Sequence, residues 1–444
     1  MTGDLLAARL AEHGLPPDEI DRKRALFDSV VAAFQPFAGS AATHAWWIPG
    51  RLEVFGKHTD YGGGRSIVGA VPRGFALIAR ARPDGAVRVR DAGREQTLEL
   101  DPPFDGYAFT GWRHYTHVVA RRLSRNFSGA RIGADIVMSS DLPSASGMSS
   151  SSALVVGLVA ALSNLAGLRD RPEWRENVRS AADEAGYYAS FENGLSFGTL
   201  GGDAGVGTHG GSEDHAAIVC GAPERLRAWR FVPIEHLADV RVPDAWTFVI
   251  ASSGVRAQKT GLAKDAYNRV ADLASAVLET WNRSEQPQAS LRAALMSDPS
   301  APDRLRQLID RNQARRWSNA DLRTRLDHFV KEDARIPEAL EAFRQADRAT
   351  LTALADASQA DAETQLKNQV PETIALARLA RERGAIAASA FGAGFGGSVW
   401  ALVDRADGAR FASDWLRDYR NRFPDRSTAT TFVARPGAPL TRLM

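Results

Sequence analysis

Cysteine is almost missing from this sequence, which contains one, Cys220, among 444 residues. A single thiol cannot form a disulfide within the chain, and it cannot supply the cysteine pairs of a structural zinc site. Because Cys220 ends an apolar run that begins at Ala216, we expect it to be a buried strand residue. The sequence therefore excludes a disulfide scaffold and a cysteine-based zinc module.

The sequence also lacks an excess of charge and any long hydrophobic run. Its 55 basic and 53 acidic residues leave a net charge of +2, so no overall field favours a nucleic acid or an anionic membrane as partner. The longest apolar stretch, Ala153 to Leu162, is shorter than the roughly 20 residues that span a bilayer, and the N-terminus has no signal-peptide pattern. We therefore expect a cytoplasmic protein that acts on a small molecule.

What is present is the composition of a globular protein, with 44% hydrophobic and 24% charged residues. At this length a single core is improbable, which favours two domains. Beyond a strand expected at Trp246 to Ser252, the sequence becomes rich in helix patterns up to about residue 384. We place the domains at 1–240 and 241–444.

Local patterns predict several elements. Arg22 to Phe34 reads as a helix, and Phe75 to Asp91 as a hairpin that turns at 83–85. Alternating apolar residues predict a half-buried strand from Ile132 to Met138, and Ala153 to Leu162 is apolar all round, as in a buried helix. The C-terminal part alternates between both types, in a small α+β unit: helix 372–383, strand 385–390, strand 398–403, helix 410–420 and strand 428–433.

Three glycine-rich segments stand out. They are Pro49–Tyr61 (PGRLEVFGKHTDY), Leu142–Ala153 (LPSASGMSSSSA) and Phe391–Ser398 (FGAGFGGS). In the second, glycine and serine directly precede the buried helix, so backbone N–H groups and the helix dipole would face a phosphate. The hydroxyls of Ser149, Ser150 and Ser151 add donors and possible Mg²⁺ ligands. A serine-rich helix cap explains this segment alone equally well.

The third segment matches the dinucleotide pattern G-x-G-x-x-G at Gly392, Gly394 and Gly397. A dinucleotide loop should open a long helix, whereas here a strand is expected at once, from Ser398 to Val403. An oxidoreductase is therefore the weaker interpretation of this segment.

Together, in this order and spacing, the three segments resemble the motifs of the GHMP kinase superfamily, and the tetrad His58 to Tyr61 resembles its galactokinase branch. The resemblance implies an α+β, two-domain fold, with an N-terminal domain of mixed sheet and helices and a ferredoxin-like α+β C-terminal domain. It also implies an ATP- and Mg²⁺-dependent kinase that phosphorylates a monosaccharide. The acceptor expected from the resemblance is the anomeric C1 hydroxyl. A different class of answer is a non-catalytic relative that senses sugar and ATP.

The resemblance also assigns roles to residues. Asp214 would be the catalytic base and Arg51 the catalytic arginine, in contact with Asp214 and the transferring phosphoryl group. The metal would lie at Ser151 and Glu192, although an apparent insertion at Leu195–Asp203 lengthens the interval between Glu192 and Asp214. The ATP-binding residues would be Ser146, Gly147, Met148, Ser149, Ser150 and Ser151.

Alternatives to the role of Asp214 remain open at this point. The residue could cap a turn, as loop aspartates often do. It could also join His209 and His215 around a metal, although neighbouring loop residues seldom converge on one ion.

The resemblance places the sugar at His58, Asp60, Tyr267 and, with a departure, Lys57. Galactokinases carry glutamate where Lys57 stands, as an acceptor for the hydroxymethyl group of the sugar, and a charged lysine cannot accept a hydrogen bond. We therefore expect a galactose-related hexose or, if Lys57 faces the sugar, a hexuronic acid. Alternatively, Lys57 turns toward the phosphates, an acid such as Glu53 or solvent, and Tyr267 is a half-buried helix residue.

Overall fold

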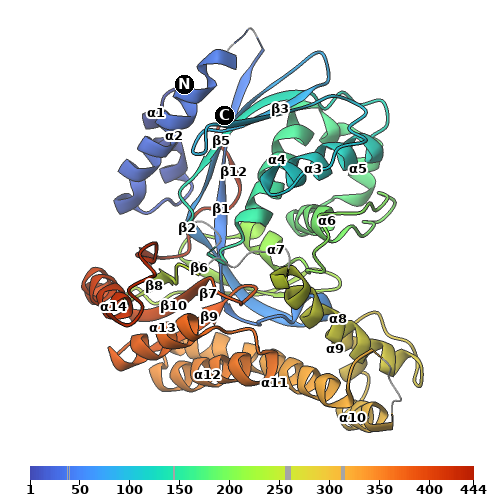
Figure 1. Ribbon diagram of the computed structural model, residues 1–444, viewed down its shortest axis with the longest axis vertical. Helices are drawn as coiled ribbons and strands as arrows, with labels where there is room; N and C mark the ends of the chain where they lie inside the picture. Colours follow the sequence, from blue (N-terminus) through green and yellow to red (C-terminus); the bar gives the residue numbers. More distant parts are fainter. Residues whose placement is uncertain (38, 40, 144–145, 256–261, 312–315) are drawn as a thin grey trace.

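The computed structural model describes the whole chain except residues 38, 40, 144–145, 256–261 and 312–315 (Figure 1). Its described strands form two sheets. The larger sheet contains β1 (Thr43–Phe55), β2 (Arg65–Ala81), β3 (Val87–Asp91), β4 (Gln96–Leu100), β5 (Ala134–Ser140), β6 (Arg225–Arg230), β7 (Glu235–Arg241) and β12 (Thr441–Arg442). The smaller sheet contains β8 (Trp246–Ser252), β9 (Ala387–Phe391), β10 (Ser398–Asp404) and β11 (Thr430–Ala434).

Helices cover both faces of the larger sheet (Figure 1). One face packs on α1 (Gly3–Glu12) and α2 (Ile20–Phe34). The other face packs on α3 (Trp112–Asn126), α4 (Ser150–Leu165), α6 (Ala181–Asn193) and α7 (Glu213–Cys220), with the short α5 (Pro172–Asn177) beside them.

Strand β1 shows how the sequence satisfies both layers. Because successive strand residues point to opposite faces, Ala45 and Trp47 join the core under α1 and α2, whereas Trp46 and Ile48 join the core under α3 and α4. All four are buried. The two covered faces explain why residues 45–48 of this strand are all apolar rather than alternating between apolar and polar.

The smaller sheet has the strand order β11-β8-β10-β9, and all neighbouring strands are antiparallel. In chain order this is strand, helices, strand, strand, helix, strand, the ferredoxin-like pattern that was expected. The remaining helices belong to this half of the chain: α8 (Leu262–Asn282), α9 (Leu291–Leu295), α10 (Ala301–Arg311), α11 (Asn319–Gln345), α12 (Arg348–Asp361), α13 (Pro371–Glu382) and α14 (Gly408–Arg422).

The two sheets meet through one apolar cluster. The end of β1 contributes Leu52 and Val54, β10 contributes Trp400, and α11 contributes Ile336 and Phe343. The change from the larger to the smaller sheet falls between β7, which ends at Arg241, and β8, and the division into domains at 1–240 and 241–444 stays our proposal. The last strand, β12, crosses back to pair with β1.

Two local predictions were wrong. Strands β2 and β3 do not form a hairpin, because β5 lies between them and pairs with both. Cys220 is buried as expected, but it ends helix α7 rather than lying in a strand.

Within the described residues, none of the helices has the length and apolar character needed to span a bilayer.

Candidate active site

All three glycine-rich segments border one cavity of about 760 Å³. Arg51 comes from β1, Gly147 from the loop before α4, and Gly392 from the loop after β9. Each segment therefore contributes to a common site, although 96 positions separate Arg51 from Gly147 and a further 245 separate Gly147 from Gly392.

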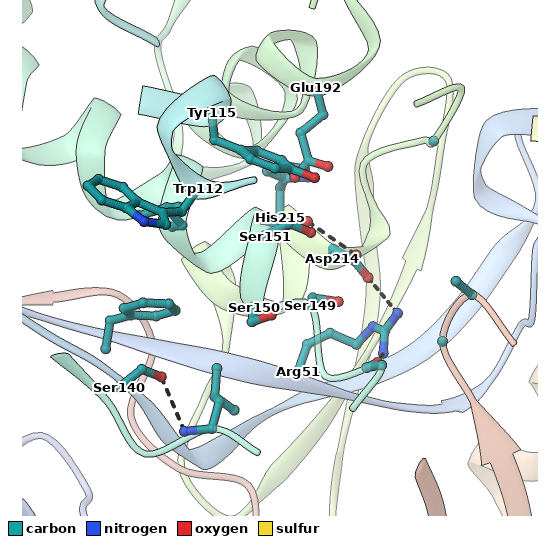
Figure 2. Close-up of a pocket in the computed structure, with 18 of the residues that line it drawn as sticks. Arg51, Trp112, Tyr115, Ser140, Ser149, Ser150, Ser151, Glu192, Asp214 and His215 are labelled. Carbon is teal, nitrogen blue, oxygen red and sulfur yellow. Dashed lines mark hydrogen bonds and ion pairs between the residues drawn. The ribbon is translucent and has the colours of Figure 1, made fainter. Parts of the chain in front are cut away.

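Four serines at the start of α4 line this cavity: Ser149, Ser150, Ser151 and Ser152 (Figure 2). Ser149 has a φ of 58°, and its side chain does not cap the helix. The sequence left open whether a serine side chain caps this helix. Because Ser149 does not, the first backbone N–H groups of α4 remain suited to bind an anion. Residues 144 and 145 of this segment lie outside the described residues.

Arg51 and Asp214 form an ion pair on the cavity wall, with Arg51 Nη2 2.7 Å from Asp214 Oδ1 (Figure 2). The Ser152 hydroxyl donates to the other Asp214 oxygen at 3.3 Å. Arg51 Nη1 also donates to the Gly147 carbonyl oxygen at 3.0 Å. The ion pair therefore lies directly beside the serines at the start of α4. The side chain of Asp214 is more exposed to solvent than that of Arg51.

The third segment packs against the first two. The Gly392 N–H donates to Glu53 Oε2 at 3.0 Å. Gly392 has a φ of 80°, and a Cβ at this position would lie 2.5 Å from the Gly147 carbonyl oxygen. Only glycine allows this approach, so the loop after β9 closes the site by backbone contact.

Buried carboxyl groups surround the guanidinium of Arg51. Burial raises the pKa of Glu53 to about 7 and that of Glu213 well above its usual value, and it also raises the pKa of Asp60. Burial alone would lower the pKa of Arg51, but Asp214, Glu53 and Glu213 together raise it above its ordinary value. Arg51 is therefore a permanent cation in this site.

One end of the cavity is lined by polar side chains that can form hydrogen bonds. Asp60 Oδ2 accepts from the Glu213 N–H at 3.2 Å, so Asp60 holds the start of α7, which carries Asp214. The imidazole Nδ1 of His58 lies 3.1 Å from the Tyr61 hydroxyl, and the ring of His58 faces that of Tyr267 at 5.9 Å. His58, Asp60, Tyr61 and Tyr267 all line the cavity.

The other end is more apolar. Its wall is formed by side chains from β2, β5, α3, α4 and the loop before α4: Phe75, Met138, Trp112, Tyr115, Leu154, Leu142 and Pro143. Figure 2 shows Trp112 and Tyr115 on the α3 side of the cavity, above the serines of α4. An apolar wall of this kind suits a flat aromatic ring.

Three family models match the chain. The GHMP kinases N terminal domain matches residues 114–196, the GHMP kinases C terminal domain matches residues 339–421, and the galactokinase galactose-binding signature matches residues 32–81. The chain thus carries both the N-terminal and the C-terminal domain of the GHMP kinases, together with a galactokinase galactose-binding signature.

Several relatives align over most of the chain. It is 27% identical over 405 residues to the galactokinase of Roseiflexus sp. (strain RS-1), spanning 89% of this chain and 92% of that one. It is 25% identical over 397 residues to the galactokinase of Streptomyces coelicolor, spanning 86% of this chain and 90% of that one.

Solved structures show that the chain has the GHMP kinase fold. The Lactococcus lactis galactokinase, solved in complex with galactose, aligns with a TM-score of 0.75 at 21% identity, covering 94% of this chain and 99% of that one. The Methanococcus jannaschii mevalonate kinase aligns with a TM-score of 0.54 at 13% identity, covering 90% of this chain and 99% of that one.

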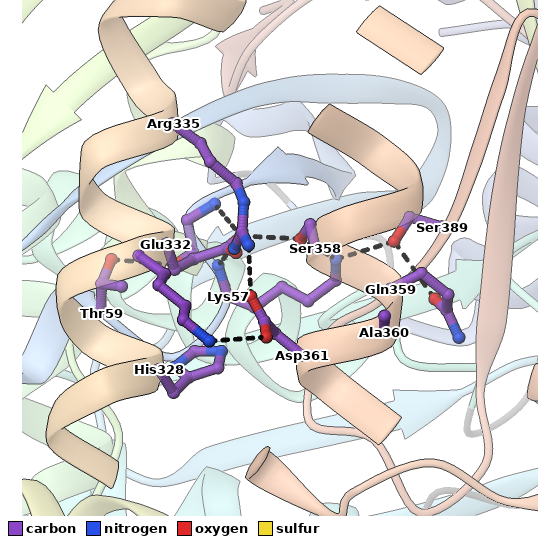
Figure 3. A network of polar contacts seen from close by, with 12 residues as sticks. Lys57, Thr59, His328, Glu332, Arg335, Ser358, Gln359, Ala360, Asp361 and Ser389 are labelled. Atoms are coloured by element: carbon purple, nitrogen blue, oxygen red, sulfur yellow. Dashed lines mark hydrogen bonds and ion pairs between the residues drawn. The ribbon is translucent and has the colours of Figure 1, made fainter. Parts of the chain in front are cut away.

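The structure contradicts the prediction that Lys57 binds the sugar. Lys57 does not line the cavity and is only 1% exposed. Its ammonium group donates to the hydroxyls of Ser358 at 2.6 Å and Ser389 at 2.8 Å, from α12 and β9 (Figure 3). The side chain points into the C-terminal half because that half supplies its acceptors, so the argument for a hexuronic acid loses its basis.

Two residues that we predicted to bind ATP are buried beneath the cavity surface and do not line it. Met148 is 1% exposed and packs in the apolar cluster between the sheets. Ser146 is buried, and its carbonyl oxygen accepts from the Ser398 hydroxyl at 2.6 Å. Neither residue lines the cavity, because their short loop alternates between the cavity and the core.

The predicted metal-binding residues, Ser151 and Glu192, both line the cavity. Ser151 interacts with the Tyr115 hydroxyl, and Glu192 Oε1 lies 3.4 Å from His215 Nε2. Across the described residues, no group of three or more His, Cys, Asp or Glu side chains is arranged to hold a metal ion. This geometry also argues against a metal site made by His209, Asp214 and His215.

Sequence reasoning missed other residues of the wall. Trp112 and Tyr115 lie in a region that carries no motif, and only the fold brings α3 over the serine loop. Glu213 and His215 adjoin Asp214 in the sequence, so that adjacency was a usable signal. Glu53 lies inside the first motif, where its contact with Gly392 depends on a segment 339 residues away.

Proposed function

We propose that this protein is an ATP- and Mg²⁺-dependent sugar kinase that phosphorylates a neutral monosaccharide of the galactose type, with the anomeric C1 hydroxyl as the expected acceptor. The observation that carries the proposal is the Arg51–Asp214 ion pair beside the serines of α4. This arrangement supports the proposal, because a carboxylate and a fixed cation lie next to a helix start that suits a phosphate.

The roles follow from the chemistry of phosphoryl transfer. Asp214 accepts the proton of the attacking hydroxyl, and Ser152 orients its second oxygen. Arg51 stabilises the negative charge that develops on the transferring group, because it is held rigid in a site of low dielectric. The second and third glycine-rich segments keep Arg51 in place, because Arg51 Nη1 donates to the Gly147 carbonyl oxygen and Gly392 packs beside both.

ATP would lie with its base at the apolar end and its phosphates along Ser149, Ser150 and Ser151. Ser151 and Glu192 suit Mg²⁺, since this ion prefers oxygen ligands and is usually held by one or two protein groups together with substrate phosphates and water. When bound, Mg²⁺ would neutralise charge on the phosphates. The small number of protein ligands fits that mode.

The sugar would occupy the end formed by His58, Asp60, Tyr61 and Tyr267. Carboxyl groups of Asp60, Glu213 and Asp214 border this end, and Arg51 is already paired. A sugar carboxylate would face the charged Asp214, so we favour a neutral sugar. The galactose-binding signature at 32–81 and the galactose complex of the Lactococcus lactis protein support galactose or a close relative.

The test measures ADP release with ATP in the presence and absence of Mg²⁺, across galactose, related neutral hexoses and pentoses, galacturonate and glucuronate. We expect Mg²⁺-dependent release with a neutral sugar and little with a uronate. If sugar and ATP bind but no sugar gives turnover, the non-catalytic sensor is the correct function.

A further inference from the structure

Helix α11 holds the backbone of the sugar-binding loop, residues 56–65, although it lies more than 250 residues further along the chain. Glu332 of α11 accepts from the N–H groups of Gly56 at 3.0 Å and Lys57 at 3.3 Å. The next residue of the helix, Asp333, accepts from the Arg65 N–H at 2.8 Å. These contacts fix both ends of the loop that carries His58 and Asp60.

A second anchor from the same helix holds the middle of the loop. Arg325 donates to the carbonyl oxygen of His58, and it also donates to the Tyr61 hydroxyl at 3.2 Å. Arg325 and Glu332 are seven residues apart, which places them on one face of the helix, two turns apart. Because His58 has a φ of 57°, its backbone needs such support to keep that conformation.

Lys57 and Glu332 belong to one continuous polar network (Figure 3). The Lys57 ammonium donates to Ser358, whose hydroxyl donates in turn to Glu332 Oε1 at 3.0 Å. The Ser389 hydroxyl accepts from Lys57 and donates to Gln359 Oε1 at 3.2 Å. Lys57, Ser358 and Ser389 thus each donate to an acceptor inside this network, as burial of polar groups requires.

The charges of the network balance. Arg335 Nη1 donates to Glu332 Oε2 at 2.5 Å, and its other nitrogen pairs with Asp361. Lys57 and Arg335 are thus matched by Glu332 and Asp361. Glu332 is fully buried, so its carboxylate depends on these partners.

We propose that Glu332 and Lys57 are positioning residues for the sugar, which act by fixing the loop of His58 and Asp60 on the C-terminal helices. This inference rests on the proposed sugar kinase function. It gives Lys57 a role that does not require contact with the substrate. Small displacements of positioned groups reduce binding and rate strongly, so loosening this loop affects the sugar and not the nucleotide.

The test compares Lys57→Met and Glu332→Gln with the control Asp361→Asn. The control breaks pairs in the same network, with Arg335 and Lys331, but Asp361 makes none of the loop contacts described above. We expect Lys57→Met and Glu332→Gln to raise the KM for the sugar about tenfold or more, with the KM for ATP changed less than about twofold. Asp361→Asn lowers the Tm and leaves the sugar KM unchanged.

Equal sugar KM values in wild type and Lys57→Met, or an equal rise in Asp361→Asn, would overturn the inference. If Glu332→Gln does not fold, Lys57→Met decides. If the wild type phosphorylates no sugar, the proposed function fails, and amide hydrogen exchange of residues 56–61 then tests the positioning alone. Faster exchange in Lys57→Met than in Asp361→Asn supports it, and equal exchange contradicts it.

Discussion

Arg51 and Asp214 lie 163 positions apart in the chain, on β1 and α7, yet their side chains form a buried ion pair of 2.7 Å. The pair depends on the whole core of the larger sheet, because β1 and α7 pack on each other there. Glu213 and Glu53 lie next to it, at 3.6 and 3.7 Å from nitrogens of Arg51. The chemistry that we propose is therefore a property of the fold and not of a single motif.

Replacing Asp214 by asparagine keeps the shape of the side chain and removes its charge and basicity. We expect Asp214→Asn to lower kcat by about 10² or more, because the attacking hydroxyl loses its base, while ATP affinity changes little. Steady-state kinetics and a separate ATP titration measure both quantities. Turnover near the wild-type value would remove Asp214 from the mechanism.

Replacing Arg51 by lysine keeps the charge but loses the planar fork. One ammonium group cannot reach Asp214, Gly147 and the phosphoryl group together, whereas Arg51 donates through several nitrogens. We expect kcat to fall by about tenfold or more in Arg51→Lys. An unchanged kcat would mean that only the charge of Arg51 matters.

A methyl group at Gly392 would enter the contact between the third and second segments. We expect Gly392→Ala to lower the Tm and to reduce kcat, because its Cβ would lie 2.5 Å from the Gly147 carbonyl oxygen. Gly384→Ala is the matched control, with a similar φ of 85° and nothing within 4 Å of the added Cβ. The control isolates the cost of the positive φ, about 1–2 kcal/mol. Equal effects of the two variants would show that the contact is unimportant.

The stability of the protein should depend on pH through Glu53. Its pKa is about 7 in the folded protein against an ordinary 4.5, mainly because of burial. Between these values the folded state binds more protons than the unfolded state, so this contribution to stability is full below pH 4.5 and is lost as the pH rises through 7. Glutamine does not titrate.

We therefore expect the Tm of Glu53→Gln, relative to wild type, to rise from pH 5 to pH 8. The corresponding change in the free energy of unfolding is at most about 3 kcal/mol. Glu213 is present in both proteins, so its own titration largely cancels in the comparison. A Tm difference that does not vary with pH would contradict the buried, protonated state of Glu53.

Local patterns were sufficient for much of the fold. The strand expected at Trp246 to Ser252 matches β8, and the buried helix expected at Ala153 to Leu162 forms the centre of α4. Both segments have a strong apolar pattern with clear polar or glycine limits. The false hairpin at Phe75 to Asp91 shows the limit of this reasoning, because strand order depends on β5, which comes some 40 residues later.

The site shows the same division. The motifs led to Arg51, Asp214, His58, Asp60 and the serines, because those residues sit next to glycines that shape loops. The direction of Lys57 could not be predicted, since it is decided by Ser358, Ser389 and Glu332, more than 270 residues away. A single substitution in a motif therefore did not reveal which way its side chain turns.

The central claim is that Asp214 and Arg51 transfer phosphate from ATP to a sugar hydroxyl. The most direct measurement is phosphorus NMR of reactions containing ATP, Mg²⁺ and galactose, with wild type and Asp214→Asn in parallel. We predict that wild type converts the γ-phosphate into a sugar phosphate ester, and that the variant binds ATP but forms this product at least about 10² more slowly. Equal product formation by both proteins, or release of inorganic phosphate alone, would contradict the account.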